Sequence, residues 1–265
     1  GALEATVALD TTAATGEVAA APRRLLAVKA SLDGDLDRLK IDDISITFES
    51  DGKPQLVTGK ALARLGQTIE IEASLASRWL DLDRLAGAAK DAGPAAVAQA
   101  LARALVDSSA GSTAEVRFGI GIDQATIGGD SVGNFRLATV KTPERFEITR
   151  LSGRLPGSTE AELSGRLAIS GDAVEFRGPI NAGGASLARL LRWAVPGHPL
   201  EGAVQDGAFA LAAGLVVVAD EIAADDLAVE LGGTTVKGSV RYRRGGTPFL
   251  ELALASDRLD ASATF

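Results

Sequence analysis

The stretch that decides the fold reads Ile69-Glu70-Ile71-Glu72-Ala73-Ser74-Leu75 and continues as Ala76-Ser77-Arg78-Trp79-Leu80-Asp81-Leu82-Asp83-Arg84-Leu85. Apolar and polar residues alternate in its first half, and this period of two predicts a β-strand with one buried face. From Leu80 onward, apolar residues are separated by carboxylates, which indicates a polar turn followed by a helix. We interpret Asp81 and Asp83 as the solvated side of the turn, with Asp83 capping a helix that begins near Arg84.

Related junctions recur along the chain at a fixed distance from a glycine. A spacing of 18 positions separates Gly59 from Ser77, Gly165 from Gly183 and Gly238 from Ser256. Repeated units of this kind build an extended body. We therefore predict one continuous structure of about three β repeats. These are residues 1–107 with a helical insertion at the C-terminal end, residues 112–199, and a truncated unit at residues 200–265.

Two further helices are predicted among the strands. Ala95 to Val106 is rich in Ala, Leu and Arg and is preceded by Pro94, which suits a first helical turn. Ala185 to Trp193 is the second, and Pro196-Gly197-His198-Pro199 ends it. Glycine-containing turns such as Gly128-Gly129-Asp130 and Gly245-Gly246 separate the remaining alternating segments. The fold class is therefore mainly β, with short helices at the repeat junctions.

The composition excludes several kinds of site. The net charge is −8, which argues against nucleic acid as a partner, because phosphate binding needs clustered Lys and Arg. Cysteine is absent, and His198 is the only histidine, so we expect no catalytic residues, no metal site and no cofactor. Methionine is also absent, even at position 1, so we expect a processed product or a piece of a longer protein.

The Gly-led strand, the amphipathic hairpin and the stretch Leu75 to Gly87 together resemble the AsmA family, which includes the TamB-like and YhdP-like proteins. Leu254 to Asp260 is a shortened echo of the same stretch. The resemblance implies a long, strongly curved antiparallel β-sheet with a taco-shaped cross-section and an apolar inner groove. It also implies a periplasmic protein of Gram-negative bacteria that carries phospholipid between the inner and outer membranes and supports outer-membrane assembly. Its inner-membrane anchor is expected to lie outside this segment.

Alternation along the strands names the residues expected to line such a groove, because every second side chain shares a face. Polar residues including Glu70, Glu72, Glu115, Arg117, Glu175, Arg177 and Glu251 are expected on the opposite face. The candidates for contact with phospholipid or another acyl-chain lipid are Ile69, Ile71, Leu75, Val116, Phe118, Ile120, Ile122, Val174, Phe176, Leu250, Leu252 and Leu254.

A second reading assigns the same residues to a filled core. In that case the chain is a structural or adhesive β-solenoid, sandwich or barrel without a ligand. The chain contains only 11 aromatic residues, and many apolar positions are alanine, which fills volume poorly. These two observations favour the groove. A third reading, a hydrolase, lacks a recognisable acid and base pair.

Overall fold

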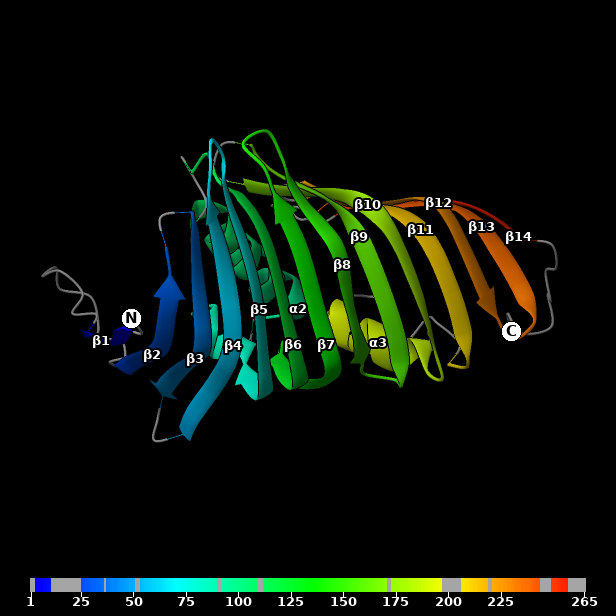
Figure 1. The fold of residues 1–265 in the computed structure, drawn as a ribbon. Coiled ribbons are helices and arrows are strands. Elements are labelled where there is room, and N and C mark those ends of the chain that lie inside the picture. The colour runs from blue at the N-terminus through cyan, green and yellow to red at the C-terminus, as the bar shows by residue number, and fades with distance from the viewer. Residues whose placement is uncertain are drawn as a thin grey trace, which may run out of the picture.

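The described part of the chain forms a single β-sheet whose strand order follows the sequence order. The computed structural model describes residues 3–10, 25–35, 37–50, 53–89, 92–108, 112–170, 173–196, 206–218, 221–243 and 249–256. Within these ranges, fourteen strands pair in order from β1 to β14, which leaves the sheet open at both edges (Figure 1). The mainly β fold is confirmed. The described strands form neither a sandwich nor a closed barrel.

The longest strands have 13 residues, and the two edge strands are the shortest, with 8 residues each. They are β1 (Leu3–Asp10), β2 (Leu25–Gly34), β3 (Arg38–Ser50), β4 (Lys53–Leu65), β5 (Ile69–Asp81), β6 (Glu115–Ile127), β7 (Asp130–Lys141), β8 (Phe146–Leu155), β9 (Thr159–Ser170), β10 (Ala173–Gly184), β11 (Phe209–Val218), β12 (Glu221–Leu231), β13 (Thr234–Arg243) and β14 (Phe249–Ser256).

The sheet is mixed, which corrects the expectation of a wholly antiparallel one. β5 and β6 pair in parallel, with Ile71 opposite Val116, whereas the other pairs of neighbouring strands are antiparallel. Parallel neighbours require a crossover of a dozen or more residues. The helices α1 (Leu82–Leu85) and α2 (Pro94–Ser108) lie in the segment that makes this crossover. The helix predicted at Ala95 to Val106 is therefore confirmed as α2.

Strand register assigns side chains to the two faces of the sheet. One row of paired residues runs from Ile71 through Val116, Phe146 and Phe176 to Leu250. All twelve predicted groove residues lie on the face that contains this row. The parallel row with Glu72, Arg117, Arg177 and Glu251 lies on the other face. We call these the inner face and the outer face.

The helices cover the inner face. α2 and α3 (Leu187–Ala194) lie on the same side of the sheet (Figure 1). One core cluster joins Val97 of α2 to Leu80, Ile122 and Val132 of the strands. A second cluster, centred on Phe146, Ile148, Leu167 and Phe176, is covered by Ala102, Leu105 and Val106 of α2. The core therefore lies between α2 and the middle of the sheet.

The starts of α1 and α3 both differ from the expectation. Asp81, not Asp83, is the N-cap of α1, because its side chain accepts a hydrogen bond from the Arg84 backbone N–H. Helix α3 begins after Ser186, two residues later than predicted. His198 and the Gly245-Gly246 turn lie outside the described residues. Within the described ranges, no helix combines the length and hydrophobicity needed to cross a membrane.

Candidate functional site

An apolar pocket lies between the helices and the inner face of the sheet. Its volume is about 260 Å³. Helix α2 forms one wall, strands β6 to β10 form the opposite wall, and Trp193 of α3 contributes to the lining. The larger side chains that line it are Leu82, Val97, Leu101, Leu105, Ile127, Val132, Phe135, Leu137, Ile148, Leu151, Leu155, Leu163, Leu167, Ile180 and Trp193.

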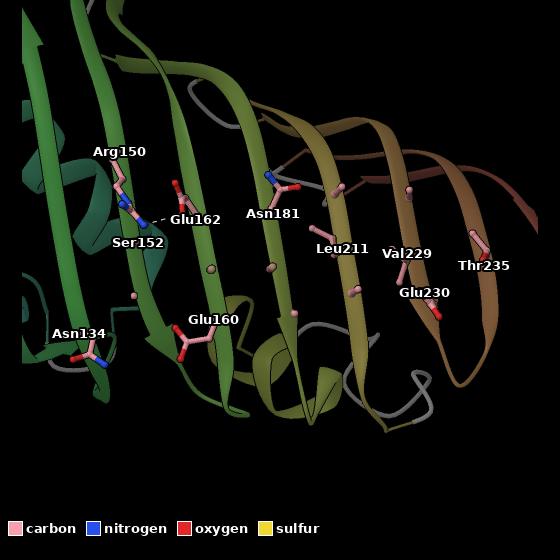
Figure 2. A pocket seen from close by; sticks show the side chains of 17 residues that line it. Asn134, Arg150, Ser152, Glu160, Glu162, Asn181, Leu211, Val229, Glu230 and Thr235 are labelled. Atoms are coloured by element: carbon pink, nitrogen blue, oxygen red, sulfur yellow. Dashed lines mark hydrogen bonds and ion pairs between the residues drawn. The ribbon is translucent and has the colours of Figure 1, made fainter.

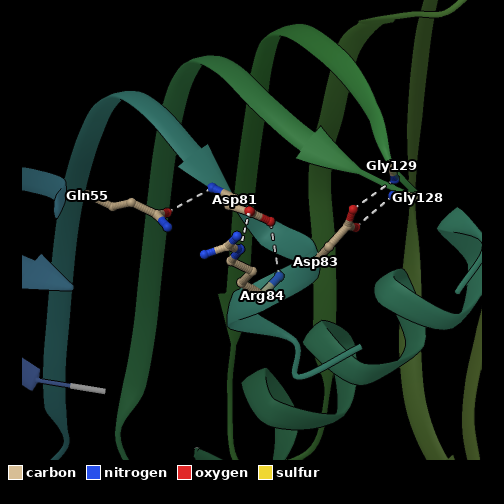
Figure 3. Close-up of polar contacts among 6 residues, drawn as sticks. All are labelled: Gln55, Asp81, Asp83, Arg84, Gly128 and Gly129. Atoms are coloured by element: carbon tan, nitrogen blue, oxygen red, sulfur yellow. Dashed lines mark hydrogen bonds and ion pairs between the residues drawn. The ribbon is translucent and has the colours of Figure 1, made fainter. Parts of the chain in front are cut away.

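The turn between β6 and β7 lies beside the pocket, because it follows Ile127 and contacts Pro94, both of which line the pocket. Gly128 and Gly129 have positive φ, the region that glycine adopts without strain. The Asp83 carboxylate accepts hydrogen bonds from both backbone N–H groups, at 2.6 Å from Gly128 and 2.8 Å from Gly129 (Figure 3). Pro94 packs so closely on Gly128 that a Cβ added there would lie 2.7 Å from the proline Cδ. The turn, α1 and the start of α2 are thereby joined.

The adjoining strand and helix are also fixed by polar contacts. Gln55, which is buried on β4, accepts a hydrogen bond from the Asp81 backbone N–H at 2.8 Å (Figure 3). The indole Nε1 of Trp193 donates to the Ile127 carbonyl at 2.9 Å. These contacts hold α1 and α3 at the same end of the pocket.

Helix α3 is positioned by a serine and an aspartate. Ser186 is its N-cap and accepts from the Arg189 N–H, while its hydroxyl donates to Asp206 at 2.7 Å. The backbone N–H groups of Ala188 and Gly207 donate to the same carboxylate. The Ser186 hydroxyl, followed by these backbone donors, holds the pKa of Asp206 below its usual range. The carboxylate therefore stays ionised where it anchors the helix.

None of the twelve predicted groove residues lines this pocket. Ile122 and Phe176 are buried in the two core clusters, and Leu75, Ile120 and Val174 pack against these clusters. Ile71, Val116, Phe118 and Leu250 are half-buried on the inner face. Ile69, Leu252 and Leu254 are 44%, 48% and 48% exposed there. The alternation predicted the face correctly, but the position of α2 decides which residues reach the pocket.

Buried polar residues interrupt the inner face, and the alternation gave no sign of the two on β7. Thr139 and Lys141 are both buried on β7. The Lys141 ammonium donates to the carbonyls of Ser112 and Ala114, at the start of β6. Buried ammonium groups need such partners. Lys141 therefore has a structural role at the return of the chain from α2 to the sheet.

A shallow groove of about 700 Å³ crosses the outer face over strands β8 to β13 (Figure 2). Its ion pairs join Arg150 to Glu162 at 3.2 Å and Arg154 to Glu160 at 2.7 Å. Exposed pairs of this kind contribute little energy, so we assign them no role beyond making this face polar.

The chain also contains a motif that resembles a hydrolase nucleophile. Gly129-Asp130-Ser131-Val132-Gly133 has the G-x-S-x-G spacing, but it begins β7 after a hairpin turn. A nucleophile elbow requires a turn from a strand into a helix. The Ser131 hydroxyl accepts a hydrogen bond from Gln124, which is not a base. The described part of the chain contains no cluster of three metal-ligating side chains.

Comparison with known proteins does not place the chain in a family. No family model matches it, and neither a curated protein nor a solved structure does. Function is therefore inferred from the inner face itself.

Proposed function

We propose that this chain is a segment of an AsmA-like envelope protein whose inner face binds acyl chains of phospholipid. The observation that carries the proposal is the apolar pocket beneath α2, which lies on a face shared by the apolar residues of β5, β6, β10 and β14. Charged residues occupy the other face. A sheet with this division presents one apolar surface to a lipid and one polar surface to water.

The pocket is large enough for a hydrocarbon segment. Small-molecule sites commonly range from about 300 to 1,000 Å³. Apolar cavities of about 150 Å³ take up benzene, so one of about 260 Å³ accepts part of an acyl chain. Each methylene group transferred from water contributes about 0.8 kcal/mol. Headgroups would remain at the polar rim.

The repeats and the curved, taco-shaped cross-section belong to the same proposal. Gly59, Gly165 and Gly238 lie in equivalent surroundings, because a Cβ on each would collide with a carbonyl of the next strand. The carbonyls belong to Ser74, Arg177 and Ala253 respectively. The three strands that contain these glycines, β4, β9 and β13, each precede a strand that ends at a predicted junction. This equivalence supports three related units, 1–107, 112–199 and 200–265, in one curved groove.

In this proposal the protein is not an enzyme. It works in the periplasm, tethered to the inner membrane through an anchor outside this segment, and passes phospholipid towards the outer membrane. A second candidate is a structural or adhesive protein without a ligand. The buried clusters beneath α2 favour that candidate, because side chains fill much of the space there.

A filled-pocket variant separates the two candidates. Leu151→Trp places a larger ring in the pocket, since Leu151 pairs with Leu137 and Leu163 and all three line it. The matched control is Leu56→Trp, the same change at a 50% exposed position on the outer face. Both variants and the original chain are purified from a bacterial periplasm, and bound phospholipid is quantified by mass spectrometry.

We expect phospholipid to co-purify with the original chain and with the control. The amount bound to Leu151→Trp should be at least tenfold lower. Far-ultraviolet circular dichroism establishes that both variants fold. Equal lipid occupancy in Leu151→Trp and in the control contradicts the pocket assignment. An original chain that carries no lipid supports the ligand-free candidate.

A further inference from the structure

Helix α2 occupies the part of the inner face where an acyl chain would have the most apolar contact. It covers the cluster around Phe146, Ile148, Leu167 and Phe176 and also forms a wall of the pocket. We propose that α2 is a displaceable lid, and that lipid binding moves its C-terminal half away from the sheet. This inference rests on the proposed lipid-binding function and adds its regulation.

The burial of α2 decreases along the helix. Pro94 is buried, Val97 is 0% exposed, and both lie at the end that is fixed against Gly128. Leu101 and Leu105 are only half-buried, and Ala104 is exposed. Local opening is easiest where few apolar contacts are lost. The C-terminal half is therefore the half that opens, with the Pro94 end as its pivot.

The surface by which α2 packs on the sheet is apolar, in contrast to the polar anchors of its neighbours. Helix α1 is fixed by Asp83 on Gly128 and Gly129, and α3 by Asp206 on Ser186. Val97, Leu101 and Leu105 of α2 instead face the pocket with hydrocarbon. An acyl chain offers the sheet the same kind of contact. It can therefore replace these leucines without leaving a buried polar group unpaired.

The pocket shows that α2 does not fill the space beneath it. At about 260 Å³ it lies below the usual range for ligand sites. The exposed apolar residues Ile69 and Leu252 lie on the same face, towards opposite edges of the sheet. A chain that extends from either edge into the pocket has to pass under α2. Movement of α2 enlarges the site and joins its parts.

The helix is suited to move as a unit. Its sequence, PAAVAQALARALVDS, consists largely of strong helix formers. Displacement therefore costs mainly contact with the sheet, and a displaced helix of 15 residues frays more readily, so its amides exchange faster. With such a lid, the apparent affinity for lipid equals the affinity of the open state multiplied by the fraction of molecules in which the lid is open.

The lid is tested by whether a variant with weakened packing of α2 binds an acyl-chain probe more tightly or more weakly than the original chain. In Leu101→Ala/Leu105→Ala, contacts between α2 and the sheet are weakened, whereas in Leu56→Ala a leucine is removed from the outer face. Binding of dansyl-labelled undecanoic acid is measured by fluorescence titration for the complete chain and both variants. A lid predicts about tenfold tighter binding for the double variant, because more molecules are open, and no change for Leu56→Ala. A fixed wall predicts weaker binding, because two hydrophobic contacts to the probe are lost.

Hydrogen exchange supplies a readout that does not depend on the variants. With a lid, the labelled fatty acid accelerates exchange in residues 101–108 of the original chain and leaves the N-terminal turn of α2 unchanged. If the original chain binds the probe but α2 exchange slows, and the double variant binds no more tightly, the lid is wrong and the lipid site stands. If neither chain binds the probe, the proposed function itself is wrong and the lid is wrong with it.

Discussion

Replacement of Asp83 by alanine tests how the end of the pocket is assembled. Two hydrogen bonds are lost, from the N–H groups of Gly128 and Gly129 to the carboxylate. Hydrogen bonds to charged groups contribute about 1.5–3 kcal/mol each. In the variant, the Gly129 N–H can hydrogen-bond to water, because that residue is exposed. The energy lost with this second bond therefore lies at or below the low end of that range. We expect Asp83→Ala to lower the free energy of unfolding by about 2–4 kcal/mol.

Urea denaturation followed by circular dichroism measures this loss. Asp83→Asn retains one acceptor oxygen and should lose about half as much. Asp81→Ala removes the N-cap of α1, which is worth about 1 kcal/mol. Its ion pair with Arg84, whose side chain is 43% exposed, adds little. Glu144→Ala, at an exposed position, should change stability by less than about 0.5 kcal/mol. If Asp83→Ala costs no more than Asp81→Ala, the carboxylate does not fasten the turn.

Two further changes test other parts of the fold. Gly165→Val should lower the free energy of unfolding by at least about 2 kcal/mol in urea denaturation, because a Cβ there would collide with the Arg177 carbonyl and overpacking is destabilising. Gly119→Val is the matched control. The nearest atom to a Cβ at Gly119 is 3.9 Å away, so the free energy of unfolding should fall by less than about 0.5 kcal/mol. Because the pKa of Asp206 is lowered in the folded chain, its contribution to α3 is complete above about pH 4 and is lost as the pH falls through the lowered value. Hydrogen exchange of α3 should therefore accelerate in acid, and Asp206→Asn should show fast exchange at every pH; equal pH profiles for the two chains would contradict this.

Much of the sheet could be predicted because its strands alternate over long runs. Ile69 to Leu75 and Val116 to Ile122 each keep a period of two, and the register places their apolar residues on one face. Helix α2 was predictable from its alanines and leucines and from Pro94 at its start. These features are local, so one segment suffices to show them.

The pocket depends on relations that no single segment contains. Register shifts beside Asp43, Asn134 and Asp226, all at positive φ, break the alternation and change which residues face inward. The placement of α2 over β7, β8 and β9 also has no signal in the pattern of those strands. Asp83 illustrates the same limit. The sequence predicts that it caps the helix next to it, but its hydrogen-bond partners lie 45 and 46 positions away.

A single sheet with one apolar face must bury that face against another layer. Here the second layer consists of short helices, and it is incomplete. Leu65 and Ile69, which flank the turn between β4 and β5, and Leu252 and Leu254 on β14 remain 41–48% exposed on the inner face. In an ordinary domain a further sheet or helix would cover such positions. An acyl chain satisfies the same requirement, because it brings apolar surface without backbone groups that need hydrogen bonds. Under the lipid-binding function that we propose, the uncovered residues on both sides of α2 favour a ligand that extends along the face over one confined to the pocket.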